Sequence, residues 1–559
     1  MDAEKGSLAA PLFFLSLAIA CASSRLGFVA PWAAAAALLG LAGWAGAAGA
    51  ESATSRFFAA VCCYALLVAF NTLLVSPAYT PAGLFHPLLL ALAYAAFRRF
   101  NDLTERRSAF AALALGAILA AWGLAQIGAL GVARAHALFE APATYAAALN
   151  LLLVPLLALA MTGRRGALLL AVAGLLAAAM FAAGSRGGVL ALAAGLGAAA
   201  ILALRAGMLQ RRGLALTLAL LAAGWILAAG LRALPWEGVA GSGVDAPPTA
   251  EAQAASSQSR LELYDLSWRA WLDHPLVGTG YLTFRYTLEQ GRTRVPSYGA
   301  SSETWFVHND YLQTLQELGP LGLAALLALV GFPAWLSYRR IPLLPVDRRA
   351  VALAAASALA AMGIHALVEF PFYIPVCLLL YGALLGALDR RLGEASAAHA
   401  PVRKPALWYP AARTGILLVA GIVLLRPVAA EAAAEWGLRR SMAGDGPSAA
   451  LWLGAARRLE PADWRYHWYA GQFWDAQAAD AGRREAARLA ADAFAAGFDA
   501  NPLEVRNLLG KIAVHRRHRA LLDAPADRST LQAWLAQAEA LAPSHRDVRR
   551  ERELLGAAQ

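Results

Sequence analysis

Charged residues are scarce in this sequence, since Asp, Glu, Lys and Arg make up only 15% of its 559 residues. Soluble domains average about 25% charged residues. Hydrophobic residues reach 59%, and the mean hydropathy is +0.51. The apolar residues gather in runs of roughly 15–25, about the length that crosses a bilayer. These features exclude a soluble enzyme, a disordered chain and a small disulfide-stapled domain, and they indicate a polytopic membrane protein with a polar appendage.

Metal-ligand and nucleotide-binding patterns are also missing. The four cysteines lie within apolar runs, and no two of them have a metal-type spacing. The longest polar loop has no Asp-x-Asp, and the chain has neither clustered His or Cys ligands nor a Walker-type glycine loop. We therefore expect no metal, no cofactor and no disulfide. A metal-dependent transferase and an ATP-driven pump are disfavoured.

The formal net charge of +11 would suggest nucleic acid in a soluble protein. In a membrane protein, however, Lys and Arg collect in cytoplasmic loops. No basic run is interleaved with aromatic residues, as single-strand binding requires. The positive-inside rule accounts better for the charge, so we expect no nucleic-acid partner.

Thirteen apolar runs predict an all-α fold, because a helix satisfies every backbone group within hydrocarbon. The runs cover residues 8–22, 28–49, 57–76, 83–97, 108–132, 143–162, 166–184, 187–204, 213–231, 319–338, 350–369, 372–388 and 414–427. With a cytoplasmic N-terminus, the inner connections hold many arginines, whereas the short outer ones hold only Arg25, Arg134 and Arg186. An odd number of spans places the C-terminal tail outside, on the same side as the long loop 232–318.

Four parts follow from this pattern. Transmembrane helices fill residues 1–231 and 319–427, the outer loop 232–318 separates them, and a helical region occupies 428–559. In the last part Pro461, Pro502 and Pro543 recur at equal spacing between helix pairs. This spacing suggests a degenerate tetratricopeptide-type array that displays a concave surface to a protein partner. An ordinary small helical bundle accounts for it equally well.

Polar residues near the outer ends of spans need an explanation, because they cost free energy in a membrane. Arg186 stands between glycines in Gly184-Ser185-Arg186-Gly187-Gly188. Its guanidinium suits a diphosphate, since its planar fork binds phosphate oxygens in pairs. The simpler alternative is an arginine that snorkels to the lipid headgroups.

Histidines mark two further segments. His308 begins His-Asn-Asp-Tyr-Leu-Gln, where a helix leading into the tenth span is expected to start, and an imidazole can accept a proton near neutral pH. A helix cap or a packing residue is the alternative. His365 and Glu369 are four residues apart, so we expect them on one helix face. We assign Glu369 to structure rather than to catalysis.

Taken together, these motifs resemble the O-antigen ligase and polymerase superfamily of bacterial envelope proteins. Ser-Arg-Gly-Gly at 185–188 comes first, followed by Ser-Arg at 259–260, which leads to His-Pro-Leu-Val-Gly-Thr-Gly at 274–280. His-Asn-Asp-Tyr-Leu-Gln at 308–313 then closes on Glu-Leu-Gly at 317–319. The resemblance covers roughly residues 140–390. The segment 365–371 and the helical tail look more like the branch that includes O-linked protein oligosaccharyltransferases.

The resemblance implies a glycan donor on undecaprenyl diphosphate and an acceptor that is lipid A-core, a growing glycan or a protein hydroxyl. His308 would be the general base, while Arg186 and Arg260 would bind the diphosphate and stabilise its charge as the C1–O bond breaks, giving inversion. Glu303 and Asp310 are alternative bases or groups that orient His308. Additional contacts to phosphate are assigned to Arg269, Arg285, Arg292 and Arg294. For each of these charges, a solvated loop position is the alternative.

The leading hypothesis is therefore a metal-independent glycosyltransferase of the bacterial inner membrane, with its active site and tail on the periplasmic face. Ligation to lipid A-core is the default, and polymerisation or protein glycosylation the alternative. A transporter of lipid-linked glycans would show matched, Gly- or Pro-interrupted spans in two halves, and the sequence shows no such pair. A non-catalytic scaffold would leave Arg186, Arg260 and His308 without a role.

Overall fold

The fold is all-α in the parts of the chain that the computed structural model describes. These are residues 2–23, 28–46, 56–164, 166–233, 250–296, 304–394 and 409–557. Twenty-one α-helices occupy these ranges, joined by turns and a few short π- and 3₁₀-helical segments.

The helices before the long loop are α1 (Asp2–Ala22), α2 (Val29–Ala45), α3 (Arg56–Phe70), α4 (Ala82–Arg99), α5 (Asp102–Leu130), α6 (Pro142–Met161), α7 (Ala167–Ala182), α8 (Arg186–Arg205) and α9 (Arg211–Ala233). The loop carries α10 (Ala250–Asp273) and α11 (Phe284–Gln290), and is followed by α12 (Asp310–Arg340), α13 (Val346–His365) and α14 (Pro375–Glu394). The tail holds α15 (Tyr409–Met442), α16 (Gly446–Leu459), α17 (Trp464–Ala481), α18 (Arg484–Ala500), α19 (Val505–Arg517), α20 (Arg528–Leu541) and α21 (Arg546–Ala557).

Apolar helices long enough to cross a membrane run through the whole body of the protein. Among the described residues, six helical segments meet the length and composition of a span, namely 56–75, 102–130, 142–161, 186–205, 211–233 and 310–343. Three shorter apolar helices occupy 8–22, 29–45 and 167–182. Each of the thirteen predicted runs falls on a helix, but the number thirteen itself stays a prediction. The chain is an integral membrane protein.

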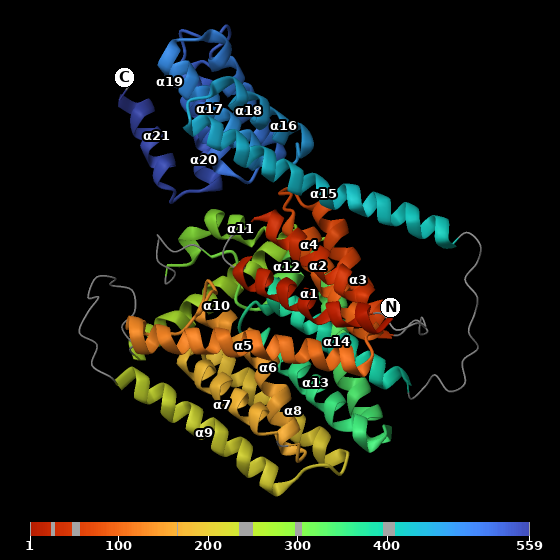
Figure 1. Ribbon diagram of the computed structural model, residues 1–559. Helices are drawn as coiled ribbons and strands as arrows, with labels where there is room; N and C mark the ends of the chain where they lie inside the picture. Colours follow the sequence, from red (N-terminus) through yellow and green to blue (C-terminus); the bar gives the residue numbers. More distant parts are fainter. Residues whose placement is uncertain are drawn as a thin grey trace.

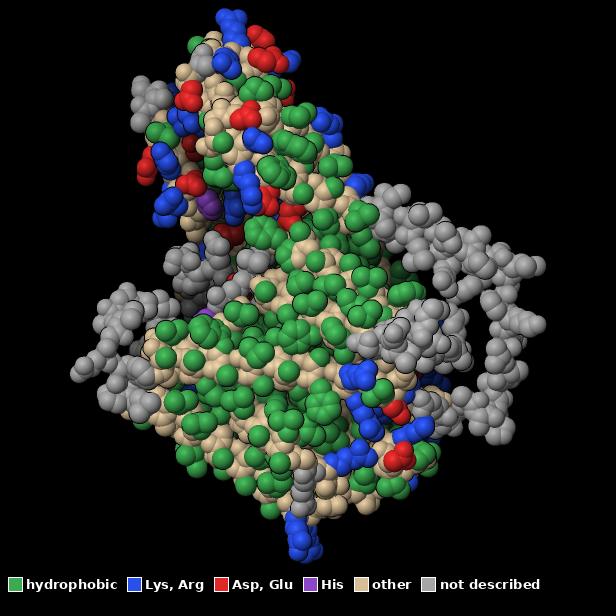
Figure 2. Space-filling view, viewed as in Figure 1, with side chains coloured by type: hydrophobic (Ala, Val, Ile, Leu, Met, Phe, Trp, Pro, Cys, Tyr) green, Lys and Arg blue, Asp and Glu red, His purple; other side chains and the backbone are tan. Residues whose placement is uncertain are grey.

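The surface of the helical body agrees with this environment. Figure 2 shows hydrophobic side chains covering the visible face of the body, whereas charged side chains gather on the C-terminal helices and at one end. Leu66, Leu74, Trp225 and Ile226 are among the large apolar side chains that are 60% or more exposed. Contiguous apolar surface of this extent is rare on soluble monomers and fits contact with lipid.

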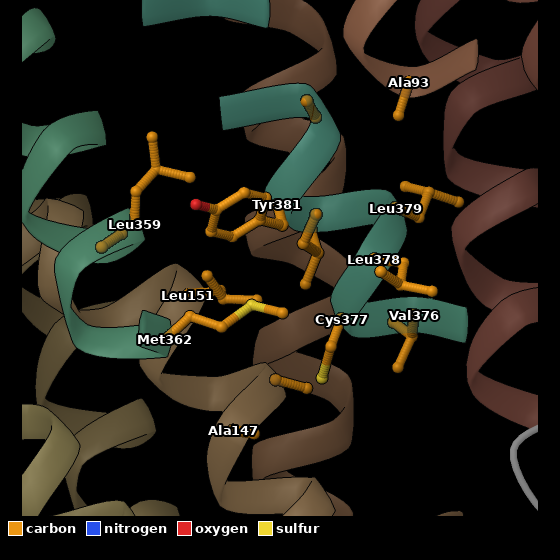
Figure 3. Close-up of a cluster of buried hydrophobic side chains, with 14 of the residues drawn as sticks. Ala93, Ala147, Leu151, Leu359, Met362, Val376, Cys377, Leu378, Leu379 and Tyr381 are labelled. Carbon is orange, nitrogen blue, oxygen red and sulfur yellow. The ribbon is translucent and has the colours of Figure 1, made fainter. Parts of the chain in front are cut away.

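Small and large side chains interlock in the core of the body. α14 packs along α4, and α13 packs along α6 and α8. Figure 3 shows Tyr381 and Cys377 of α14 facing Leu359 and Met362 of α13 and Leu151 of α6. The buried hydroxyl of Tyr381 donates to the carbonyl of Leu329 at 3.1 Å, so the ring fills the core without an unpaired polar group.

The arginines that the sequence assigns to the cytoplasm meet at one end of the bundle. Arg98 pairs with Asp389 at 3.0 Å, and Arg390 pairs with Glu105 at 2.5 Å. Arg164 donates to the carbonyl of Asp347. The first two contacts join the α4–α5 connection to the end of α14, and the third joins the α6–α7 and α12–α13 connections, so arginines gather at one end of the bundle.

At the opposite end, the loop after α10 is held against a kink in α12. The kink lies at Gly319, whose φ of 69° and ψ of −171° suit glycine alone. The amides of Thr279 and Gly280 donate to the carbonyls of Gln316 and Glu317 at 2.8 and 3.0 Å. The Gly-Thr-Gly and Glu-Leu-Gly motifs therefore pack against each other and fix the start of α12.

The C-terminal helices lie beyond the same end as this loop (Figure 1). The carboxylate of Glu431 on α15 accepts from the amides of Val29 and Ala30, which caps α2. Asn501 donates to the buried hydroxyl of Tyr286 on α11 at 2.8 Å. Pro461, Pro502 and Pro543 follow the ends of α16, α18 and α20, so the spacing seen in the sequence marks equivalent turns.

Gly319→Ala tests the kink. A β-carbon at this position would lie 2.3 Å from the carbonyl oxygen of Leu276, in a backbone conformation that costs about 1–3 kcal/mol for other residues. We expect a clear fall in the thermal midpoint of the detergent-solubilised protein, followed by tryptophan fluorescence. Gly331→Ala, on the same helix with no atom within 4 Å, should leave the midpoint nearly unchanged. Equal midpoints for the two variants would contradict the kink's role.

Candidate active site

The N-terminus of α12 positions His308. Asn309 caps the helix, its side chain accepting from the amide of Leu312 at 3.1 Å. Gln313 holds the backbone segment before the helix: its side chain accepts from the amide of Val307 at 2.9 Å and donates to the carbonyl of Trp305 at 3.3 Å. His308 itself has a φ of 61°, a left-handed conformation that is uncommon for residues other than glycine. Strained residues of this kind cluster at functional sites.

The connection between α13 and α14 is tied to the same helix start. The amide of Asp310 donates to the carbonyl of Ala366 at 2.8 Å, and the Asp310 carboxylate accepts from the amide of Phe372 at 2.8 Å. The rings of Phe306 and Phe370 stack at 4.0 Å. These contacts bring Glu369, which lies between α13 and α14, next to His308.

Glu369 bridges two of the residues that the sequence analysis selected. One carboxylate oxygen lies 2.9 Å from Nδ1 of His308, and the other lies 2.6 Å from a terminal nitrogen of Arg260. The Glu369 side chain is only 5% exposed, whereas those of His308 and Arg260 are 24% and 26% exposed. The carboxylate is therefore shielded, while the imidazole and the guanidinium both reach the surface of the site.

Helix α10 supports the bridge from one side. Arg260 and Tyr264 are four residues apart and lie on the same face of α10. While Arg260 binds Glu369, the hydroxyl of Tyr264 donates to the backbone carbonyl of His308 at 3.0 Å. One helix face therefore holds both ends of the His308–Glu369 pair.

Arg186 reaches the site from the N-terminus of α8. Ser185 caps this helix, accepting from the amide of Gly188 at 3.0 Å. A β-carbon on Gly187 would lie 3.2 Å from Nε2 of His365 and 3.3 Å from Cγ of Glu369, so glycine lets α8 approach the bridge closely. The exposed Arg186 side chain contacts Ser257 of α10, with Nη1 and Oγ 3.5 Å apart.

The electrostatics of the bridge favour an ionised carboxylate. Burial by itself raises the pKa of Glu369, but the hydrogen bond from His308 and the positive charges around it leave this pKa below its usual value. An ionised carboxylate accepts hydrogen bonds only, so Nδ1 of His308 carries the proton. The lone pair of the imidazole is then on Nε2, away from Glu369, as a general base requires.

The remaining candidates lie elsewhere. Asp310 is fully buried, and its carboxylate ties the backbone at Phe372 rather than facing His308. Arg269 is exposed and pairs with Asp265 on its own helix at 2.7 Å. The guanidinium of Arg285 lies over the ring of Trp305 at 4.4 Å, beside the C-terminal helices. Arg292 pairs with Glu289, and Arg294 ends the same short turn. Glu303 lies outside the described residues.

Glu369 has partners that its position in the sequence did not indicate. We expected it to share a helix face with His365, but α13 ends at His365, and no hydrogen bond joins the two side chains among those described. Its partners are 61 and 109 residues away in the chain. The spacing of His365 and Glu369 was the only sign in the sequence that Glu369 has a partner, and it indicated His365 rather than His308 or Arg260. In the described part of the chain no three His, Cys, Asp or Glu residues group as metal ligands.

Comparison with known families finds a match in the middle of the chain. Residues 148–327 match the O-antigen ligase family, a segment that begins within α6 and ends within α12. The matched segment includes Arg186, Arg260 and His308, whereas Glu369 and the C-terminal helices lie after it. No curated protein matches the chain.

Glu369→Gln should destabilise the protein, because it leaves the Arg260 guanidinium beside a neutral group. We expect a loss of about 1–3 kcal/mol, below that of a fully buried pair since Arg260 is partly exposed. The matched control, Asp265→Asn, breaks the exposed pair with Arg269 and should cost under about 0.5 kcal/mol. Because the pKa of Glu369 is lowered, its contribution holds at neutral pH and is lost as the pH falls through that lowered value. Thermal unfolding at pH 7 and at acidic pH measures both effects, and equal losses for the two variants at pH 7 would contradict the bridge.

Proposed function

We propose that this protein transfers a glycan from a polyprenyl diphosphate to an acceptor hydroxyl at the periplasmic face of the bacterial inner membrane. The observation that carries the proposal is the Glu369 carboxylate, which joins the imidazole of His308 to the guanidinium of Arg260 at the surface of the site. The O-antigen ligase match over residues 148–327 supports glycan transfer of the ligase or polymerase type.

In this proposal His308 acts as the general base. Its Nε2 takes the proton from the acceptor hydroxyl as the acceptor oxygen forms a bond to C1 of the donor sugar. Glu369 is a positioning residue: it fixes the tautomer and the orientation of the imidazole, and it stabilises the imidazolium that forms. The carboxylate does not take up the proton.

The leaving group is the lipid diphosphate, which departs with the electron pair of the broken C1–O bond. Arg260 uses one terminal nitrogen on Glu369, so other N–H groups of its five-donor fork remain for phosphate oxygens. Arg186 adds a second guanidinium at the N-terminus of α8, where the helix dipole also favours an anion. These charges replace the metal ion that many nucleotide-sugar transferases require. Attack opposite the leaving group inverts the anomeric carbon.

Lipid A-core is the acceptor that we propose first, because the match is to O-antigen ligases. A polysaccharide polymerase or a protein oligosaccharyltransferase would use the same base and the same cations, and would differ only in the acceptor. A transporter of lipid-linked glycans fits less well. His308 precedes the first residue of α12, Arg186 is the first residue of α8, and Arg260 lies on α10 of the outer loop, whereas transporter sites lie near the middle of the membrane.

His308→Ala should strongly reduce transfer, because it removes the proposed general base. With purified lipid-linked donor, we expect kcat to fall by about 10²–10⁴, the usual contribution of general base catalysis. Glu369→Gln should lower kcat by a similar factor, because the amide neither fixes the tautomer of the imidazole nor stabilises the imidazolium. Glu369→Asp keeps the negative charge and should recover part of the rate.

Recovery of the rate by Glu369→Asp separates positioning from a purely structural defect, which would lower the yield of folded protein in both variants. Asp265→Asn serves as the matched carboxylate control on α10 and should keep the rate. A transfer rate for His308→Ala close to that of the unaltered protein would contradict the assignment of His308 as the base.

Chelation gives an independent test. Since arginines neutralise the diphosphate in this proposal, incubation with excess EDTA followed by an assay in metal-free buffer should leave the rate within about twofold of the untreated enzyme. Restoration of a lost rate by added Mg²⁺ or Mn²⁺ would show that the leaving group depends on a divalent cation.

A further inference from the structure

A second site lies between the outer loop and the C-terminal helices. A cavity of about 430 Å³ opens where α11 and the segment around Trp305 face α19, α20 and α21. Figure 1 shows α20 and α21 above α11. The volume is within the range of small-molecule sites. The two walls are linked by the buried hydrogen bond from Asn501 to the hydroxyl of Tyr286, so the cavity belongs to a joined interface.

The lining of this cavity is basic and aromatic. Among the described residues it contains five arginines and two glutamates, which leaves an excess of three positive charges. Glu289 pairs with Arg292, and Glu504 lies 3.5 Å from Arg506. Arg549 is exposed on α21 and has no carboxylate within ion-pair distance among the described residues. Arg285 faces the rings of Trp305 and Tyr286 rather than a carboxylate.

This cavity adjoins the candidate active site through one short segment. Thr304 and Trp305 line the cavity, and the same extended segment continues through Phe306 to His308. Two hydrogen bonds to Gln313 fix this segment, and the stacking of Phe306 on Phe370 holds it against the connection between α13 and α14. A molecule held beside Trp305 therefore lies on the His308 side of the site, whereas Arg186 enters from α8.

We propose that the cavity binds an acidic saccharide, and that this saccharide is the part of the acceptor that precedes the reacting hydroxyl. The assignment of this saccharide to the acceptor rests on the proposed function, whereas the binding of an acidic saccharide in the cavity does not. Carboxylate or phosphate groups would pair with Arg549 and Arg285. The half-exposed ring of Trp305, 44% accessible, offers an apolar face to a sugar ring.

The mixed lining favours a saccharide over an acidic peptide. Sugar hydroxyls donate hydrogen bonds, so they can satisfy Glu289 and Glu504 while the acidic groups reach the arginines. A run of aspartates would instead bring its carboxylates against these two glutamates and be repelled.

Equilibrium binding to the full-length, detergent-solubilised protein tests whether the cavity binds an acidic saccharide. We expect tri-galacturonate to bind and neutral maltotriose and hexa-aspartate to bind at least ~10-fold more weakly, at about 0.1 M salt. Arg549→Gln should weaken tri-galacturonate binding by at least ~10-fold, the worth of one charge-assisted hydrogen bond. Arg285→Gln should act in the same direction, but it also removes stacking on Trp305.

Arg550→Gln is the matched control, because Arg550 is the next residue on α21, is equally exposed, and does not line the cavity. It should keep the affinity of the unaltered protein. Equal loss in both variants, equal affinity for tri-galacturonate and maltotriose, or tighter binding of hexa-aspartate would each overturn the proposal.

Steady-state kinetics of glycan transfer test whether the bound saccharide is part of the acceptor. With an acidic acceptor, Arg549→Gln should raise the acceptor KM at least ~10-fold while kcat and the donor KM stay unchanged. A raised donor KM instead would overturn the assignment to the acceptor. If the protein transfers no glycan at all, the proposed function fails, and the binding experiment still decides whether the cavity holds an acidic saccharide.

Discussion

A single buried carboxylate organises the outer end of this protein. One carboxylate oxygen of Glu369 accepts a hydrogen bond from His308, and the other accepts one from the guanidinium of Arg260. Gly187 lets α8 pack directly against this carboxylate. An isolated carboxylate in this position would be very costly, so its two partners are required for its ionised state. The same arrangement orients the imidazole of His308 and leaves the guanidinium of Arg260 partly exposed at the surface of the site. Structure and chemistry thus depend on one charge.

The first turns of α12 make that geometry possible. Glu317 accepts from the backbone of Leu282 and Phe284 and from the hydroxyl of Tyr373, while Gln313 orients the strand before His308. Asn71 of the π-helical segment after α3 ties the loop at Val277 and Tyr281 to the same place. These are buried, satisfied polar contacts, which hold a loop more specifically than apolar packing does. Residues 277–284 of the outer loop are thereby held in place as part of the site.

The C-terminal helices are attached to the rest of the protein at separated points. Glu431 caps α2 of the membrane body, and Asn501 binds Tyr286 of the outer loop. Anchors at separated points restrict rotation of these helices over the site. Such restriction is what a substrate-binding cavity between two parts of a chain needs, because a loose interface would lose the geometry of the arginines that line it.

The sequence by itself determined the helical membrane architecture and the accumulation of arginines at one end, and it selected Arg186, Arg260 and His308 as candidate site residues. Hydropathy and motif spacing are local properties, so they can be read along the chain. It also located the turns of the tail from Pro461, Pro502 and Pro543. Only the tertiary structure decided what each carboxylate contacts: Glu369 joins the imidazole of His308 to the guanidinium of Arg260, whereas Asp310 is buried against the backbone of Phe372. The physical reason is that the role of a charge is set by the groups packed against it, and those of Glu369 lie 61 and 109 residues away in the chain.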